Sequence, residues 1–292
     1  MTLDQLRIFV AVAERLHMTR AAEDLHMTQS AVSAAITTLE TRHGTKLFDR
    51  VGRGLALNAT GKAFLPEAKD VLARAEAAQT LLDDLAGLKR GSVHIHASQT
   101  IAAYWLPQRM ASFQEMHPDI DLHLSIGNTH RVIEAVLLGE AELGLVEGAE
   151  DAPLLERQTI GADRLVIAAS PDHPLANRAF TPDVTTLSSL SWVLREEGSG
   201  TRSEFESALP KGMAREQLRI SMVLPSNEAI LTAVSASHLV TAISELAARP
   251  LIEAGRLVHL PLEMPERPFY LLRHKQRSLS RAASALATAL QD

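Results

Sequence analysis

Hydrophobic residues in the first forty positions recur at helical spacing in three successive runs. Residues 3–16 place apolar side chains on one face at a period near 3.6, which predicts a first helix. Residues 19–27 and 28–40 then predict two short helices joined by a tight turn, the second with Val32, Ile36 and Leu39 in one apolar stripe. Thr28 is a good N-cap for that second helix. The pattern therefore predicts a helix-turn-helix.

A different face of the segment 28–40 is small, polar and uncharged. A helix that enters the major groove of DNA needs such a face, slim enough to fit and carrying donors and acceptors for base edges. An ordinary pair of surface helices would show the same periodicity, so the flanking sequence has to decide between the two interpretations. Our predicted DNA contacts on the helix pair are Thr19, Arg20, Thr28, Gln29, Ser30, Ser33, Ala34 and Thr37.

Two short extended pieces around Gly52-Arg53-Gly54 predict a β-hairpin, or wing, after the helix pair. Arg50 and Arg53 lie where a wing would meet phosphates or the minor groove. The alternative is a loop with two solvated arginines. We include both arginines among the predicted DNA contacts.

After Asn58, which can cap a helix, apolar positions keep helical spacing to about Leu88. At about 1.5 Å per residue, this segment predicts a rod of roughly 45 Å. An isolated amphipathic helix of this length must bury its apolar stripe, and pairing with its own copy is the simplest solution. We therefore predict a DNA-binding domain over residues 1–58 and a dimerisation helix over residues 59–88.

Beyond residue 91, short apolar runs alternate with helical segments. The predicted strands cover 93–97, 120–126, 143–146, 165–169, 192–194, 218–223, 239–243 and 269–273. This alternation predicts parallel or mixed sheets covered by helices, and hence an α/β domain over residues 91–292. The fold class of the whole chain is then α+β.

Composition and charge limit the classes of site and protein that fit this sequence. The chain has 292 residues, is 46% hydrophobic and has no cysteine, which excludes disulfides, thiolate zinc sites and cysteine nucleophiles. We see neither a secretory signal nor a membrane span, and expect a cytoplasmic protein without a membrane partner. The net charge is −6, but residues 1–58 hold seven Lys and Arg against six Asp and Glu, or +1, which leaves −7 for the rest. This fits a DNA-binding head on a body that does not bind DNA.

The segment Glu197 to Arg202 predicts an anion site, because it follows a strand and opens a helix. Glycines let the backbone approach a ligand, a helix N-terminus offers free N–H groups, and hydroxyls add donors. A plain turn with a capping threonine is the alternative. Polar residues at the other strand ends should face the same cleft. The predicted effector contacts are Ser98, Thr100, Asn128, Thr129, Glu147, Gly198, Ser199, Gly200 and Thr201.

Glu147 adds a condition to this anion site. A carboxylate beside an anion suggests either a protonated ligand oxygen or a ligand that carries hydrogen-bond donors. A plain glutamate at a strand end is the alternative.

Several segments resemble LysR-type transcriptional regulators. In residues 1–61 they are Leu6-Arg7-Ile8-Phe9, Thr19-Arg20-Ala21-Ala22, Thr28-Gln29-Ser30-Ala31-Val32-Ser33, Leu47-Phe48-Asp49-Arg50 and the Gly61 position. The rod and the α/β body match the rest, so the resemblance covers the whole chain. It implies a winged helix-turn-helix, a linker helix and an effector domain like a periplasmic binding protein, whose subdomains we place at 91–162 with 266–292 and at 163–265. It also implies tetramers, built from two dimers, on promoter DNA, where they would meet RNA polymerase.

Two positions depart from the family pattern. Ala34 stands where the family often has a basic residue, although it can still touch a thymine methyl. Ala236-Ser237-His238 replaces the usual glycine-rich turn, so we carry over no effector contacts there. Ser98-Gln99-Thr100-Ile101 and residues 194–202 resemble the branch that regulates carbon-fixation genes and sulfite or cysteine metabolism. That resemblance implies a small oxyanion or a phosphorylated metabolite as effector, and of the two we favour an oxyanion such as sulfite.

Other functional classes find less support in the sequence. Ser199 is not part of a Gly-x-Ser-x-Gly elbow, and His94 and His96, with His123, lack the spacing of a metal ligand set. A solute-binding protein would explain the body but not the head, and an enzyme fused to a DNA-binding head would need a catalytic constellation. We expect an effector-gated, homo-oligomeric transcription regulator that has no cofactor and is not an enzyme.

Overall fold

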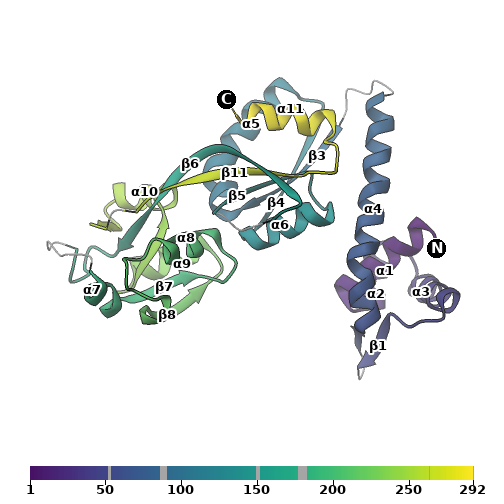
Figure 1. Cartoon of the computed structure of the whole chain (residues 1–292), viewed down its shortest axis with the longest axis horizontal. Helices are drawn as coiled ribbons and strands as arrows, with labels where there is room; N and C mark the ends of the chain where they lie inside the picture. The colour runs from purple at the N-terminus through teal and green to yellow at the C-terminus, as the bar shows by residue number, and fades with distance from the viewer. Residues whose placement is uncertain (52–53, 86–90, 149–151, 177–182, 263, 292) are drawn as a thin grey trace. The chain divides into compact units, whose positions relative to one another are not determined.

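A computed structural model describes residues 1–51, 54–85, 91–148, 152–176, 183–262 and 264–291. The chain divides into two compact units, residues 1–87 with 138–140, and residues 88–137 with 141–292 (Figure 1). Helices dominate the first unit, and the second mixes helices with a large sheet, which confirms the predicted fold class. In the described part of the chain, no helix is long and apolar enough to cross a membrane. Arg53 and residues 86–88 of the predicted linker helix lie outside the described residues.

The first unit is a helical head with a hairpin. Its elements are α1 (Leu3–Arg15), α2 (Met18–Asp24), α3 (Gln29–His43), β1 (Phe48–Val51), β2 (Gly54–Leu57) and α4 (Ala59–Leu85). Their apolar stripes pack into one core, in which the ring centroid of Phe9 lies 5.6 Å from that of Phe48 and 5.0 Å from that of Phe64. The helix-turn-helix, the hairpin and the long helix are thus present where the sequence predicts them.

Local hydrogen bonds explain where α3 and α4 begin. The hydroxyl of Thr28 accepts from the N–H of Ala31 at 3.3 Å, and the amide of Asn58 accepts from the N–H of Gly61 at 2.9 Å. Position 61 needs a glycine, because a Cβ there would lie 2.2 Å from the carbonyl oxygen of Leu47. The start of α4 therefore packs directly against the chain that enters the hairpin.

The second unit is built on one extended sheet. Its strands are β3 (Gly91–Ser98), β4 (Ile120–Gly127), β5 (Leu143–Glu147), β6 (Leu155–Ala169), β7 (Ser191–Arg195), β8 (Arg219–Leu224), β9 (Val240–Ser244), β10 (Val258–Leu260) and β11 (Glu266–His274). Its helices are the π-helix η1 (Ile101–Trp105), α5 (Leu106–Met116), α6 (Thr129–Leu138), α7 (Val184–Ser189), α8 (Gly200–Ser207), the 3-10 helix η2 (Arg215–Gln217), α9 (Asn227–Ser235), α10 (Glu245–Glu253) and α11 (Arg281–Ala289). The strand order is β4-β3-β5-β11-β6-β9-β7-β8, with β10 beside β6.

Two long antiparallel strands, β6 and β11, join the two halves of this sheet (Figure 1). Residues 155–164 of β6 pair with β11, whereas residues 165–169 pair with β9. Separate apolar cores lie on either side, one around Ile95 and Phe269 and the others around Trp192 and Ile230. The predicted subdomain limits, at 162/163 and 265/266, fall on these two strands and stay a prediction.

Several elements of the second unit were missed or misplaced by the sequence pattern. The strand predicted at 165–169 begins already at Leu155, where exposed polar residues at 156–159 break the alternation. The helix α10 was missed because Pro250 lies inside it, and α7 and β10 are too short to show a period. The π-helix η1 begins directly after Thr100 and leads into α5 at Leu106.

Candidate functional site

The polar face of α3 is exposed, as a groove-binding helix requires. Its apolar stripe is buried, with Val32 at 0% exposure and Ile36 at 3%. One hydroxyl on this face already has a hydrogen-bond partner within the helix, because Thr37 donates to the carbonyl of Ser33 at 2.9 Å. Ser33 is half-buried, and the other predicted contacts of this helix are exposed, namely Thr28, Gln29, Ser30, Ala34 and Thr37.

The remaining predicted DNA contacts come from α2 and the hairpin. Thr19 and Arg20 are exposed in the first turn of α2, which His17 caps by accepting from the N–H of Arg20. Arg50 is exposed on β1 opposite Leu55. The elements that precede and follow α3 in the chain thus both carry exposed polar side chains, while Arg53 lies outside the described residues.

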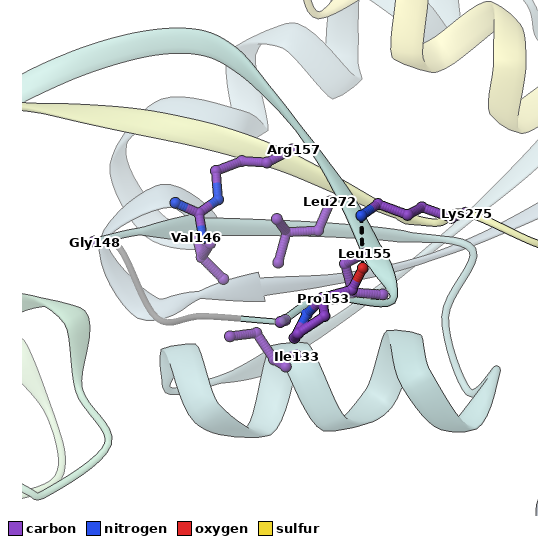
Figure 2. Close-up of a pocket in the computed structure, with 9 residues that line it drawn as sticks. Ile133, Val146, Gly148, Pro153, Leu155, Arg157, Leu272 and Lys275 are labelled. Carbon is purple, nitrogen blue, oxygen red and sulfur yellow. Dashed lines mark hydrogen bonds between the residues drawn. The ribbon is translucent and has the colours of Figure 1, made fainter.

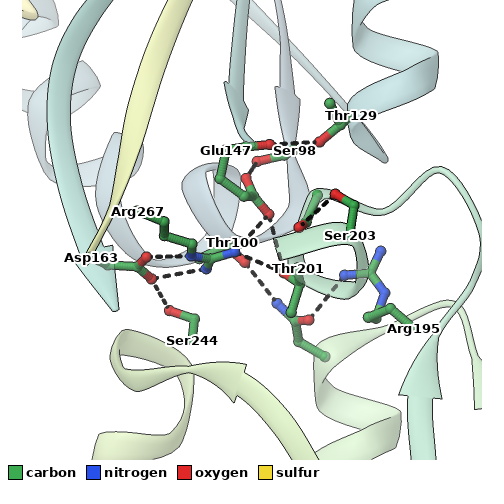
Figure 3. Close-up of polar contacts among 12 residues, drawn as sticks. Ser98, Thr100, Thr129, Glu147, Asp163, Arg195, Thr201, Ser203, Ser244 and Arg267 are labelled. Carbon is green, nitrogen blue, oxygen red and sulfur yellow. Dashed lines mark hydrogen bonds and ion pairs between the residues drawn. The ribbon is translucent and has the colours of Figure 1, made fainter. Parts of the chain in front are cut away.

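The predicted effector residues lie at strand ends and helix starts of the second unit, and hydrogen bonds join four of them, namely Ser98, Thr129, Glu147 and Thr201 (Figure 3). Glu147, the last residue of β5, is only 2% exposed. The hydroxyl of Ser98 donates to its carboxylate, and Oγ1 of Thr201 lies 3.2 Å from its Oε1. Thr129 donates instead to the backbone carbonyl of Glu147, at 3.1 Å. The ends of β3 and β5 and the start of α8 are thus joined by side-chain hydrogen bonds.

A buried arginine that the sequence analysis did not identify completes this network. Arg267 on β11 is 1% exposed and makes a two-pronged ion pair with Asp163 of β6, with 2.9 Å between Nη2 and Oδ2. Its Nη1 donates to Oγ1 of Thr201 at 3.1 Å and lies 3.6 Å from Glu147. The hydroxyl of Ser244 also donates to Oδ2 of Asp163. Arg267 therefore links the strands that join the two halves of the sheet to the start of α8 (Figure 3).

The charges in this network do not cancel. Burial alone would lower the pKa of the Arg267 guanidinium, but the adjacent Glu147 and Asp163 carboxylates raise that pKa above its ordinary value. With both carboxylates ionised, the three groups sum to −1. A further negative charge would be repelled, and a ligand hydrogen that the Glu147 carboxylate accepts in a hydrogen bond would offset part of that repulsion.

The start of α8 holds a polar atom that the network leaves unused. Ser199 is the N-cap of α8 and is 2% exposed, but it makes no capping hydrogen bond, and its hydroxyl has no partner among the residues that the structure describes. The first N–H groups of a helix have no partner within the helix and carry partial positive charge. A buried hydroxyl without a partner is costly unless something else binds it.

Other predicted effector residues use their polar groups in packing. Asn128 caps α6 by accepting from the N–H of Arg131 at 2.9 Å. The carbonyl of Gly198, whose φ is +82°, accepts from the N–H of His130 at 3.2 Å. Position 200 must be glycine, because a Cβ there would lie 2.2 Å from the carbonyl oxygen of Glu147. These three positions set the distance between α8 and the ends of the strands.

A cavity of about 330 Å³ also lies in the second unit, on the other side of β5 (Figure 2). Lys275 and Pro153 are part of its wall, and the Lys275 ammonium donates to the Pro153 carbonyl at 2.6 Å. The other lining residues are Ile133, Val146, Gly148, Ala152, Leu155, Arg157 and Leu272. None of these lining residues takes part in the hydrogen bonds and ion pairs described above for the network around Glu147, and none was predicted to contact the effector.

The histidines weighed as metal ligands do not form a ligand set. The rings of His94 and His123 stack on adjacent strands with their centroids 4.8 Å apart. Within the residues that the structure describes, no group of three metal-binding side chains is close enough to hold an ion.

Comparison with family models assigns both units. The model "Bacterial regulatory helix-turn-helix protein, lysR family" matches residues 3–62, and "LysR substrate binding domain" matches residues 86–292. The chain belongs to the LysR family of transcription regulators. It is therefore a DNA-binding regulator with an effector-binding domain and not an enzyme, as predicted.

Curated relatives support the predicted branch of the LysR family. The chain is 34% identical over 284 residues to the uncharacterized regulator YeiE of Escherichia coli K12, covering 96% of this chain and 94% of that protein. It is 33% identical over 287 residues to the RuBisCO operon transcriptional regulator of Allochromatium vinosum, covering 97% and 93%. It is 34% identical over 231 residues to CysL of Bacillus subtilis, covering 79% and 76%.

Solved structures with lower identity share the fold. Full-length CbnR complexed with its target DNA has a TM-score of 0.68 at 19% identity and covers 100% of this chain and 99% of CbnR. The regulatory domain of Synechocystis CcmR in complex with 2-PG has a TM-score of 0.62 at 24% identity and covers 69% of this chain and 96% of CcmR.

Proposed function

We propose that this LysR-family regulator binds a small oxyanion that carries a proton, with hydrogen sulfite as the first candidate, at the start of α8. The unpartnered hydroxyl of Ser199 is the observation that carries the proposal. It is buried at a helix N-terminus, where donors and positive potential favour an anion. The hydroxyl of Thr201 lies in the first turn of the same helix and that of Thr100 just after β3, and both residues are 1% exposed or less.

The network around Glu147 selects which oxyanion fits. Glu147 lies 3.2 Å from Thr201, so an anion bound by Thr201 reaches a carboxylate. Because two carboxylates face one guanidinium, an anion that reaches Glu147 needs an acidic hydrogen that the Glu147 carboxylate can accept in a hydrogen bond. Hydrogen sulfite and the protonated phosphate anions carry such a hydrogen near neutral pH, whereas sulfate carries none. The CcmR domain, which has the same fold, was solved with 2-PG, and this supports a small-molecule site in such a domain.

The residues of the head would bind promoter DNA. Gln29, Ser30, Ser33, Ala34 and Thr37 would contact bases in the major groove, because α3 presents them on one slim face. Thr19, Arg20 and Thr28 at the helix starts, together with Arg50 and Arg53 of the hairpin segment, would contact phosphates or the minor groove.

Self-association would convert ligand binding into a change at the promoter. The helix α4 spans 27 residues, and pairing with a second copy would bury its apolar stripe and present two heads to two half-sites. Dimers of such dimers, working in the cytoplasm, would change DNA bending and RNA polymerase contact when ligand favours one state of the effector domain. An unchanged footprint and bend on a bound promoter fragment after ligand addition would contradict this step.

A thermal-shift screen of the full chain tests the site. The panel contains sulfite, phosphate, sulfate, thiosulfate and short carboxylates. A ligand at about 100 times its dissociation constant adds about 2.7 kcal/mol, which gives a clear shift. We expect a shift with sulfite or phosphate, none with sulfate, and loss of the shift in Thr100→Ala and Thr201→Ala. Glu147→Gln should admit sulfate, because it removes the negative charge.

Ser199→Ala provides the sharpest variant. It should raise the stability of the ligand-free protein by about 1 kcal/mol, because it removes a buried hydroxyl without a partner. The same variant should weaken sulfite binding about tenfold. Ser280→Ala is the matched control at the N-cap of α11, where the hydroxyl accepts from the N–H of Ala283 at 3.1 Å. It should instead lower stability by about 1 kcal/mol and leave sulfite binding unchanged. No shift from any anion in the wild type would contradict the proposed site.

A further inference from the structure

We propose that Asn227 sets the direction of the Thr100 hydroxyl and is therefore a positioning residue of the effector site. The inference rests on the proposed function, because Thr100 is one of the proposed oxyanion contacts. Asn227 is the first residue of α9 and is fully buried, and sequence analysis assigned it no role.

Arg195 fixes which way the Asn227 amide faces. The guanidinium of Arg195 is held by Glu196, with 2.8 Å between Nε and Oε2 and 2.9 Å between Nη2 and Oε1. Its Nη1 lies 3.0 Å from Oδ1 of Asn227. An arginine offers donors only, so the amide oxygen must face Arg195 and the amide nitrogen must point the other way.

The amide nitrogen then meets Thr100. Nδ2 of Asn227 lies 3.4 Å from Oγ1 of Thr100, and both residues are 0% exposed. Because an amide NH₂ only donates, the oxygen of Thr100 is the acceptor, and its proton is directed elsewhere. Gln99 fixes the backbone on the same side, since its Oε1 accepts from the N–H of Asn227 at 2.7 Å.

This arrangement decides what Thr100 can offer a ligand. A hydroxyl that already accepts from Asn227 presents its proton, which suits the acceptor oxygens of an anion. If an acceptor stood at position 227, Thr100 would donate to it and would present only a lone pair to the ligand. Asn227 thereby favours oxyanions over donor-rich ligands, although it need not touch the ligand itself.

Asn227→Asp replaces the amide group that donates to Thr100 with a carboxylate oxygen that accepts, and it hardly changes the shape of the side chain. Gln99→Glu is the matched control. Gln99→Glu adds the same charge on the same side of Thr100 but keeps an acceptor for the Asn227 N–H. Titrations of the full chain with sulfite, and in parallel with phosphate, should show Asn227→Asp losing at least about tenfold more affinity than Gln99→Glu. In a Thr100→Val background the difference between the two variants should disappear.

The pH dependence separates positioning from a merely structural role. Protonation of the new aspartate restores a donor, so the affinity of Asn227→Asp relative to wild type should recover as the pH is lowered. The ratio to wild type at each pH removes the titration of the anion itself. Equal losses in Asn227→Asp and Gln99→Glu, or a ratio that does not change with pH, would overturn the inference alone. Failure of the wild type to bind either anion would overturn the proposed function and this inference together.

Discussion

The surface of α3 that we propose to face DNA and the network around Glu147 are polar regions of opposite construction. On α3 the polar side chains are exposed, come from neighbouring positions, and rest on a buried apolar stripe. Around Glu147 they are buried, come from β3, β5, β6, α8 and β11, and mostly bind one another. Most side chains of the first region are exposed to water, although the hydroxyl of Thr37 already donates to the carbonyl of Ser33. The second is already satisfied, apart from single groups such as the Ser199 hydroxyl.

This difference teaches where substitutions should act. A side chain on the exposed face of α3 contributes to partner binding but little to stability. A side chain in the buried network contributes to both, because removal of one partner leaves another buried and uncompensated. The predictions below test this contrast, from the largest expected effect to the smallest.

Arg267→Met should have the largest effect on stability. It leaves the buried carboxylates of Glu147 and Asp163 without their cation, which should cost about 3–5 kcal/mol. The control is Arg273→Met on the same strand, where the guanidinium pairs with Glu156 at 2.8 Å but both side chains are about half exposed. That variant should cost at most about 1 kcal/mol in urea unfolding. Similar losses in both variants would contradict the role given to Arg267.

Gly200→Ala should come next. The added Cβ would meet the carbonyl oxygen of Glu147 at 2.2 Å and the hydroxyl of Thr129 at 2.6 Å, so α8 would have to move. We expect a loss of about 1–3 kcal/mol in unfolding experiments together with loss of anion binding. Ser207→Ala, an exposed position of the same helix, is the control and should change neither. Unchanged anion binding in Gly200→Ala would show that the ligand does not lie at the start of α8.

Substitutions in the head should change DNA binding without a comparable loss of stability. Gln29→Ala should reduce the preference for specific over non-specific DNA by the equivalent of about 1–3 kcal/mol. Arg50→Ala should instead weaken binding to all sequences and lower the slope of affinity against salt by about 1. Binding titrations at several salt concentrations distinguish the two. Equal losses of sequence preference in both variants would contradict this division.

The smallest effect concerns pH. Burial and the nearby charge of His238 lower the pKa of His173 below its ordinary value. Because the unfolded chain then binds the proton more readily, His173 favours the folded state above its ordinary pKa of about 6.5, and this contribution is lost as the pH falls below that value. His173→Gln should therefore flatten the fall in stability between about pH 7 and pH 5. An unchanged slope in urea unfolding across this range would contradict the assignment.

The two regions also differ in how many of their residues could be identified from the sequence. The elements of the head are determined by local contacts, because Thr28 and Asn58 cap helices through an N–H three residues away and Gly61 packs against the adjoining chain. Residue spacing alone therefore locates the helices and the hairpin. The effector site was predicted only where strand ends and helix starts mark it, as at Glu147 and Thr201. Arg267 was missed because no local pattern shows that a charged residue beside Pro268 will be buried against Asp163, which is 104 positions away in the chain. Asn227, which we propose as a positioning residue, was missed for the same reason.

Calorimetric titration of the full chain with sulfite, and separately with sulfate, tests the central claim most directly. The account predicts saturable binding of sulfite, no binding of sulfate, and binding of sulfate gained in Glu147→Gln. Binding of both anions with equal affinity by the wild type, or binding of neither, would contradict the claim that the buried Glu147 carboxylate requires a proton from the effector.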